Sequence, residues 1–155
     1  MACAMKHKVL LAEGNKTVSA ALHNVLERQL DLELIGEVDS RSEVLTLTGE
    51  LHPDIILLSH RISGPHLLET LDTIASRFPF TKVLVLSFDN DSRLALRALA
   101  AGAAGYMLKD RAYEELGDAV RTSISNGTYL SPGIAGMGRK NGVPTGSSRK
   151  AGMQA

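Results

Sequence analysis

The run Asp54-Ile55-Ile56-Leu57-Leu58-Ser59 is the most informative stretch of this 155-residue chain. Pro53 precedes it, four consecutive aliphatic residues end at a hydroxyl, and Gly64-Pro65 follows soon afterwards. Such a run, bounded by turn-forming residues, is typical of a strand that is buried on both faces at the centre of a parallel sheet. In open α/β sheets, ligands bind just beyond the carboxyl ends of such strands. Ser59 therefore lies where a functional site is expected.

Apolar runs and helical periods alternate along the rest of the chain. Besides residues 54–59, strands are predicted over residues 8–13, 32–37, 82–87 and 105–109. Apolar residues at helical spacing follow each of the five strands, between residues 18 and 30, 44 and 51, 67 and 74, 94 and 99, and 113 and 124. Asn15 or Thr17 and Ser40 are suitable N-caps for the first two helices. Five strands alternating with five helices predict a doubly wound, flavodoxin-like parallel sheet of (βα)5 type.

Composition narrows the class of protein. Lysine plus arginine and aspartate plus glutamate are equal at 17 each, so the net charge does not indicate binding to nucleic acid or a membrane. The single cysteine, Cys3, excludes an internal disulfide and fits a reducing compartment. No apolar run approaches the roughly 18 residues of a membrane-spanning helix, and the first eight residues do not resemble a secretion signal. We therefore expect a cytoplasmic protein with no contact with a membrane.

The end of the chain differs from the rest. Residues 134–155 contain four basic residues and no acidic one, and glycine, serine and other small residues are frequent from residue 133 onward. This stretch has too little apolar surface to offset the entropy of ordering it. We predict a folded domain over residues 1–132 and a flexible basic tail or linker over residues 133–155.

Four polar side chains stand at the carboxyl ends of predicted strands. They are Glu13, Ser59, Ser87 and Lys109. The carboxyl ends of parallel strands share one edge of the sheet, so the four could line a single shallow pocket. An acid, two hydroxyls and a lysine in one pocket indicate a site for a phosphoryl group.

With these residues in place, the sequence resembles the receiver domain of two-component response regulators. It is most similar to the subfamily that carries a C-terminal helix-turn-helix of the LuxR type. The resemblance covers about residues 7–132, and residues 98–110 are its most specific part. The matching stretches are Val9–Glu13, Pro53–Leu58, Val83–Ser87, Ala98–Asp110 and Gly127–Pro132.

The resemblance implies a role for each pocket residue. In the family, an aspartate at the position of Ser59 accepts the phosphoryl group, and acids at the positions of Glu13 and Gly14 help to hold Mg²⁺. This chain has lost the acceptor aspartate and the second acid. Ser87 matches the hydroxyl that senses the phosphoryl oxygens, and Lys109 matches the lysine that pairs with them.

Two further positions belong to this set. Tyr106 matches the aromatic residue that reorients on activation, although it could equally be a packing residue at the rim of the sheet. Ser63 stands in the place of the usual proline after the acceptor, and His66 stands where an acid is common. The family's signal-reading residues are thus present, whereas its phosphoryl-accepting residues are replaced.

The replacements have chemical consequences. Mg²⁺ is held by carboxylates, waters and substrate oxygens, so Glu13 alone should bind it weakly or not at all. A serine hydroxyl is protonated at neutral pH and needs an activating base to act as a nucleophile. Phosphoryl transfer depends on positioning and on metal neutralisation, and both are compromised here. We therefore predict an atypical receiver domain with no catalytic residue, no resident metal or cofactor and no enzymatic activity.

Such a domain would act by protein–protein contact or as a homodimer. The resemblance ties it to transcription control, with DNA bound only through a helix-turn-helix domain that this chain does not contain. It also suggests the interface, either about residues 91–125 or the first and last helices.

Two alternatives keep chemistry at Ser59. Ser59 could still be phosphorylated, or Ser59 and Lys109 could form a hydrolase dyad. No oxyanion-hole motif or Gly-X-Ser-X-Gly turn accompanies the serine, which disfavours the hydrolase. His60 and His66 flank the pocket without cysteines or clustered acids, which disfavours a metal site.

Overall fold

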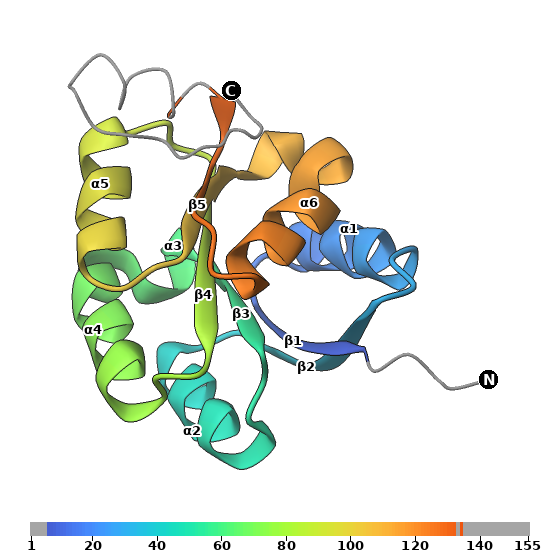
Figure 1. The fold of residues 1–155 in the computed structure, drawn as a ribbon, viewed down its shortest axis with the longest axis horizontal. Coiled ribbons are helices and arrows are strands. Elements are labelled where there is room, and N and C mark those ends of the chain that lie inside the picture. The colour runs from blue at the N-terminus through green and yellow to red at the C-terminus, as the bar shows by residue number, and fades with distance from the viewer. Residues whose placement is uncertain (1–5, 133, 135–155) are drawn as a thin grey trace.

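The structure is a computed structural model that describes residues 6–132 and residue 134. Six parallel strands form one sheet in the order β2-β1-β3-β4-β5-β6 (Figure 1). The predicted doubly wound parallel sheet is thereby confirmed. The strands are β1 (His7–Ala12), β2 (Leu32–Val38), β3 (Ile55–Ser59), β4 (Lys82–Ser87), β5 (Gly105–Leu108) and β6 (Tyr129–Leu130).

Five longer helices connect the six strands in turn. Asn15 caps the first helix by accepting a hydrogen bond from the Val18 amide, and Ser40 caps the second in the same way through the Glu43 amide, as the sequence predicts. The helices are α1 (Lys16–Glu27), α2 (Arg41–Leu51), α4 (Leu67–Arg77), α5 (Ser92–Ala100) and α6 (Ala112–Ile124). The short helix α3 (His60–Ser63) and two 3₁₀ turns, η1 (Gly64–His66) and η2 (Lys109–Arg111), complete the connections.

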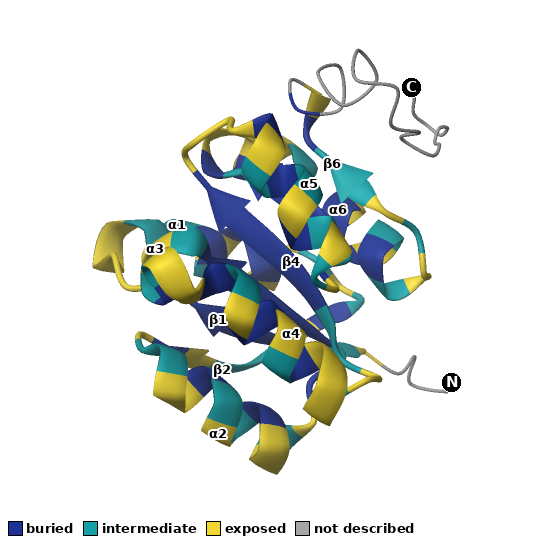
Figure 2. Ribbon diagram, turned by 90° about the vertical axis from the view of Figure 1, so that its left-hand side faces the viewer, coloured by how far each residue is buried: buried dark blue, intermediate teal, exposed yellow. Residues whose placement is uncertain are grey.

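The helices cover both faces of the sheet (Figure 1). Alternate residues of each strand point to opposite faces, so in β3 Ile56 and Leu58 pack with α2, α4 and α5, whereas Ile55 and Leu57 pack with α1 and α6. β3 is therefore buried over its whole length, and its neighbour β4 is dark blue over most of its length (Figure 2). This two-sided burial explains why residues 55–58 form an uninterrupted apolar run and not an alternating one.

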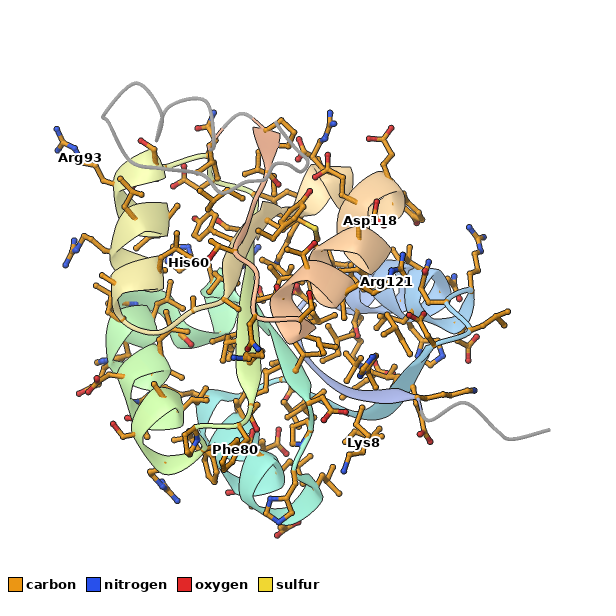
Figure 3. All side chains as sticks on the ribbon, viewed as in Figure 1. Lys8, His60, Phe80, Arg93, Asp118 and Arg121 are labelled. Atoms are coloured by element: carbon orange, nitrogen blue, oxygen red, sulfur yellow. The ribbon has the colours of Figure 1, made fainter. Side chains whose placement is uncertain are left out.

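The outer faces of the helices are polar. Arg93 on α5 and Asp118 on α6 are exposed and point away from the sheet (Figure 3). Among the described residues, no helix is both long enough and apolar enough to cross a membrane.

The sixth strand corrects the prediction of five strands. Tyr129 and Leu130 pair in parallel with Gly105 and Tyr106 at the edge of the sheet. A strand of two residues contains no periodicity, so hydrophobic patterning cannot reveal it.

The packed part of the chain reaches beyond residue 132. Ile134 has no exposed surface and belongs to the hydrophobic cluster on the α2–α4–α5 face. The flexible tail predicted for residues 133–155 otherwise lies outside the described residues.

Candidate functional site

The carboxyl ends of four strands meet at one edge of the sheet. Glu13 follows β1, Ser59 ends β3, Ser87 ends β4 and Lys109 follows β5. All four side chains are buried, with at most 6% of each residue exposed. The edge predicted from the sequence is therefore present, and its polar groups face the interior of the protein.

Lys109 joins two of these side chains. Its Nζ lies 2.6 Å from Glu13 Oε1 and donates a hydrogen bond of 2.7 Å to Ser59 Oγ. The lysine and glutamate side chains are 1% and 0% exposed. We call Glu13, Ser59 and Lys109 the lysine cluster. Its cation is paired and hydrogen-bonded by groups of this chain, as a buried charge requires.

Backbone amides hold the two partners of Lys109 in place. Glu13 Oε2 accepts a hydrogen bond of 2.9 Å from the amide of Asn15, the residue that caps α1. Ser59 Oγ also accepts a bond of 3.3 Å from the Arg61 amide in α3. The lysine cluster is thus fixed by the first turns that follow β1 and β3.

Gly14 stands at the exposed rim beside the lysine cluster. A Cβ at this position would meet only Ile62 Cγ1, at 4.0 Å, so the site has room for a side chain. A cavity of about 360 Å³ opens here and is lined by Glu13, Gly14 and residues of α1, β2 and α2. Ser59 and Lys109 do not line it.

Ser87 and Tyr106 form a second polar group, separate from Lys109. Ser87 Oγ accepts a hydrogen bond of 3.0 Å from the Asp89 amide, and Tyr106 Oη donates one of 3.2 Å to the Asp89 carbonyl. Tyr106 has no exposed surface. Burial raises the pKa of its phenol. Tyr106 is therefore turned inward and tied to the loop between β4 and α5.

Phe88 is a residue of this edge that the sequence analysis missed. Its ring centroid lies 5.2 Å from Lys109 Nζ, within the range of a cation–π interaction. The residue itself is 60% exposed. Phe88 therefore lies between the buried ammonium group and solvent. In the sequence, only its position directly after Ser87, the hydroxyl that ends β4, could have indicated that Phe88 lies at this edge.

Three other predicted positions lie near the edge. Ser63 is buried at the end of α3, and its Oγ has no hydrogen-bond partner among the described residues. His60 begins α3 and is partly exposed. His66 is exposed and its Nδ1 lies 3.3 Å from Glu69 Oε1. Within the described residues, no three histidine, cysteine, aspartate or glutamate side chains gather as a metal site would need.

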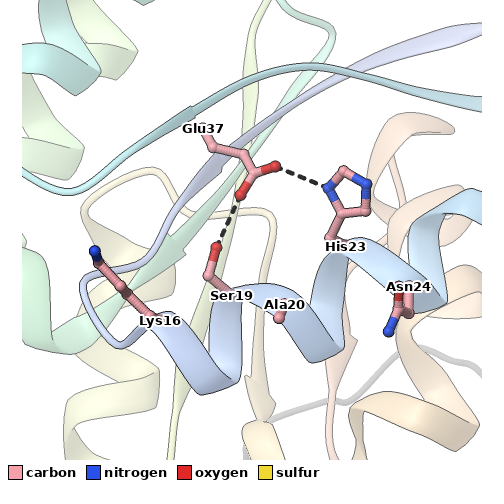
Figure 4. Close-up of a pocket in the computed structure, with 6 residues that line it drawn as sticks. All are labelled: Lys16, Ser19, Ala20, His23, Asn24 and Glu37. Atoms are coloured by element: carbon pink, nitrogen blue, oxygen red, sulfur yellow. Dashed lines mark hydrogen bonds and ion pairs between the residues drawn. The ribbon is translucent and has the colours of Figure 1, made fainter.

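A groove between α1 and β2 was also missed (Figure 4). Glu37 of β2 accepts a hydrogen bond of 2.9 Å from Ser19 Oγ and contacts His23 Nδ1 at 2.8 Å. His23 Nε2 lies 3.0 Å from Glu27 Oε2. Hydrogen bonds to Glu37 and then Glu27 raise the pKa of His23 above its usual 6.5. We call His23, Glu27 and Glu37 the histidine cluster.

Residues 9–121 match the sequence family described as the response regulator receiver domain. Response regulator GacA from Pseudomonas aeruginosa is 31% identical over 128 residues, which are 83% of this chain and 60% of that protein. Transcriptional regulatory protein LiaR from Bacillus subtilis is 33% identical over 129 residues, which are 83% of this chain and 61% of that protein. The chain spans about three fifths of the length of these curated relatives.

Solved structures agree with these matches. A LuxR-family two-component response regulator from Aurantimonas sp. superimposes with a TM-score of 0.83 at 24% identity, over 90% of this chain and 99% of that one. The signal receiver domain of the putative response regulator NarL from Mycobacterium tuberculosis superimposes with a TM-score of 0.73 at 26% identity. The match covers 78% of this chain and 98% of that one.

Proposed function

This chain belongs to the response regulator receiver domain family, and we propose that it transmits a signal through protein–protein contact without being phosphorylated. The observation that carries the proposal is the lysine cluster. Lys109 Nζ is shared between Glu13 Oε1 and Ser59 Oγ, and neither charged side chain reaches solvent. The lysine that would pair with an incoming phosphoryl group is already satisfied by the chain itself.

The position of the acceptor supports the same proposal. Ser59 has no exposed surface, and its Oγ accepts hydrogen bonds from Lys109 and from the Arg61 amide. A serine nucleophile must lose its proton to a neighbouring base. The ion pair with Glu13 uses Lys109 as a cation, whereas a general base must be a neutral amine. This arrangement disfavours both phosphorylation at Ser59 and a Ser59–Lys109 hydrolase.

The donor set also fits Mg²⁺ poorly. A carboxylate that binds Mg²⁺ must turn its oxygens toward the ion. Glu13 directs Oε1 to Lys109 and Oε2 to the Asn15 amide, and Gly14 offers no side chain. We therefore propose that the domain works without bound metal.

Two surfaces are candidates for the contact. The first is α5, β5 and α6, where Arg93 and Arg97 are exposed on α5. The second is α1 with α6, where Arg121 of α6 donates hydrogen bonds to Gln29 and Asp31 in the turn that follows α1. We propose a protein partner or a second copy of the chain on one of them. Since the curated relatives are longer regulators, we also propose cytoplasmic transcription control, with DNA contacted by a region outside this chain.

Intact mass after incubation with Mg²⁺ and acetyl phosphate tests the absence of phosphorylation. We expect no phosphoryl adduct on the natural sequence. The double variant Gly14→Asp/Ser59→Asp is the matched positive control, because position 14 has room for a side chain and the two changes restore both missing acids. That variant should gain one phosphoryl group.

A stoichiometric adduct on the natural protein that Ser59→Ala abolishes would overturn the proposal in favour of a phosphorylated Ser59. Sedimentation of the natural protein, of Arg93→Glu/Arg97→Glu and of Arg121→Glu then tests self-association. If the natural protein dimerises and neither variant weakens the dimer, both proposed surfaces are wrong.

A further inference from the structure

The segment that follows α6 closes the edge of β5. The Tyr129 amide donates to the Ala104 carbonyl at 3.1 Å, and the Ser131 amide donates to the Tyr106 carbonyl at 3.2 Å. Sheet edges with free amides and carbonyls invite pairing with another chain. Here Tyr129, Leu130 and Ser131 occupy that position. We call residues 129–132 together with Ile134 the strap.

Side chains anchor the strap at three points. Tyr129 Oη donates to Glu115 Oε1, and Arg111 Nε holds the other carboxylate oxygen at 2.7 Å. Ser131 Oγ accepts a hydrogen bond of 2.9 Å from the Leu108 amide. Ile134 is fully buried in the cluster that also contains Tyr106. The strap is thus bound through specific polar and apolar contacts and not only through its backbone.

The sequence of β5 is adapted to this neighbour. A Cβ at Gly105 would stand 2.6 Å from the Tyr129 carbonyl oxygen and 2.9 Å from Leu84 Cδ1. Only glycine allows the strap to approach β5 this closely.

Tyr106 links the strap to the pocket edge. Its carbonyl oxygen accepts from the Ser131 amide, and its phenol donates to the Asp89 carbonyl. The Asp89 amide in turn donates to Ser87 Oγ. A continuous series of hydrogen bonds therefore runs from the end of β4, through a buried tyrosine, to the strap.

We propose that docking of the strap on β5 and the inward position of Tyr106 form one coupled equilibrium. A change in the loop after Ser87 that releases the Tyr106 phenol would loosen the strap. Undocking of the strap would likewise free Tyr106, because coupling between two sites is reciprocal.

The proposal concerns regulation of the same pocket as the proposed function. It rests on hydrogen bonds among Ser87, Asp89, Tyr106 and Ser131, none of which involves Ser59. A phosphoryl adduct in the mass experiment would therefore refute the proposed function without testing the strap. An unchanged Tyr106 titration in the strap experiment would refute the coupling without bearing on phosphorylation.

The test uses Ser131→Ala in the full chain and measures the effect on the Tyr106 phenol. In protein labelled with ¹³Cζ-tyrosine, the Tyr106 phenol should titrate closer to its usual pH than in the natural protein. In the reverse direction, Ser87→Ala should raise the exchange rate of the Ser131 amide by about fivefold or more, the lower range of coupling between sites.

Ser123→Ala is the matched control. Ser123 is also a fully buried serine, but its Oγ donates to the Ala119 carbonyl inside α6 and does not touch the strap. It should change neither readout. Tyr129→Phe, which removes only the hydrogen bond to Glu115, provides a second strap variant in case Ser131→Ala does not fold. Strap variants that leave the Tyr106 titration unchanged, or a control that shifts it equally, would overturn the proposal.

Discussion

The lysine cluster and the histidine cluster pair a cationic group with carboxylates at similar distances but in different surroundings. Lys109 lies 2.6 Å from Glu13, and His23 lies 2.8 Å and 3.0 Å from Glu37 and Glu27. The first pair is 1% and 0% exposed, whereas the side chains of the histidine cluster are 38–65% exposed. Distance alone would rank the two alike, but burial makes their energetics differ.

One carboxylate of each cluster lines the same cavity. Glu13 and Glu37 both line the space of about 360 Å³ beside Gly14. Water and salt screen an exposed pair, whose contribution to stability is typically no more than about 1 kcal/mol. A buried charge that loses its partner is left uncompensated. The buried lysine cluster should therefore be sensitive to substitution, and the exposed histidine cluster should be tolerant.

The largest expected effect comes from Lys109→Met. The substitution keeps the length of the side chain but leaves the Glu13 carboxylate buried without its cation. We expect a loss of about 3–5 kcal/mol in the free energy of unfolding, measured by urea denaturation. Adding Glu13→Gln should recover much of that loss. Lys16→Met, at an exposed lysine beside the same cavity, should change stability little; an equal cost for the two lysines would refute the comparison.

Ser59→Ala should have the next largest effect. It removes the hydroxyl that accepts from Lys109, and a hydrogen bond to a charged group contributes about 1.5–3 kcal/mol. Ser63→Ala is the control, because Ser63 is also buried near the end of β3 but its Oγ has no partner among the described residues. That substitution should be neutral or slightly stabilising in the same denaturation experiment. If both substitutions cost the same, the Lys109 contact contributes nothing measurable.

Phe88→Ala should give a smaller loss, of about 1 kcal/mol, from the cation–π contact. It would also admit water and ions to Lys109. Stability of this variant should consequently depend on salt concentration more than stability of the natural protein does. Phe80→Ala serves as the control, since Phe80 is 92% exposed. Equal salt dependence in Phe88→Ala and the natural protein would mean that the ring does not shield the lysine cluster.

The sequence predicts the lysine cluster better than the histidine cluster for a physical reason. Glu13, Ser59 and Lys109 follow apolar strands, and parallel strands bring their carboxyl ends to one edge whatever the details of packing. Topology alone therefore brought these residues together. His23 and Glu37 meet only because α1 packs beside β2 at a particular depth and rotation, which periodicity does not specify.

The strap and Phe88 show a second limit of sequence analysis. Tyr129 and Leu130 pair with β5 through backbone groups, and two residues carry no period. Phe88 is an aromatic residue in a loop, where exposure is the default expectation. Its contact depends on the direction of the Lys109 side chain, which the sequence does not reveal. Elements with long apolar runs could thus be predicted, whereas contacts that depend on side-chain direction could not.

The smallest expected effect is a pH dependence at His23. Hydrogen bonds to Glu37 and Glu27 raise its pKa in the folded protein above 6.5, so folding favours the protonated ring. The resulting stabilisation is fully present below pH 6.5 and is lost as the pH rises through the folded-state pKa. The difference in free energy of unfolding between the natural protein and His23→Gln should therefore shrink as the pH is raised through that window.

Glu37→Gln, made in the natural protein and in His23→Gln, tests whether Glu37 is the partner of His23. It removes the first acceptor of His23. It should flatten the pH dependence of stability in the natural protein and leave that of His23→Gln unchanged. A difference that is constant with pH, or that grows above neutrality, would contradict the assignment. Lys109→Met, measured against the natural protein over the same range, completes the comparison. The histidine cluster is open to solvent, so protonation of His23 should change the free energy of unfolding only slightly. Removal of one partner from the buried lysine cluster should instead destabilise the whole domain.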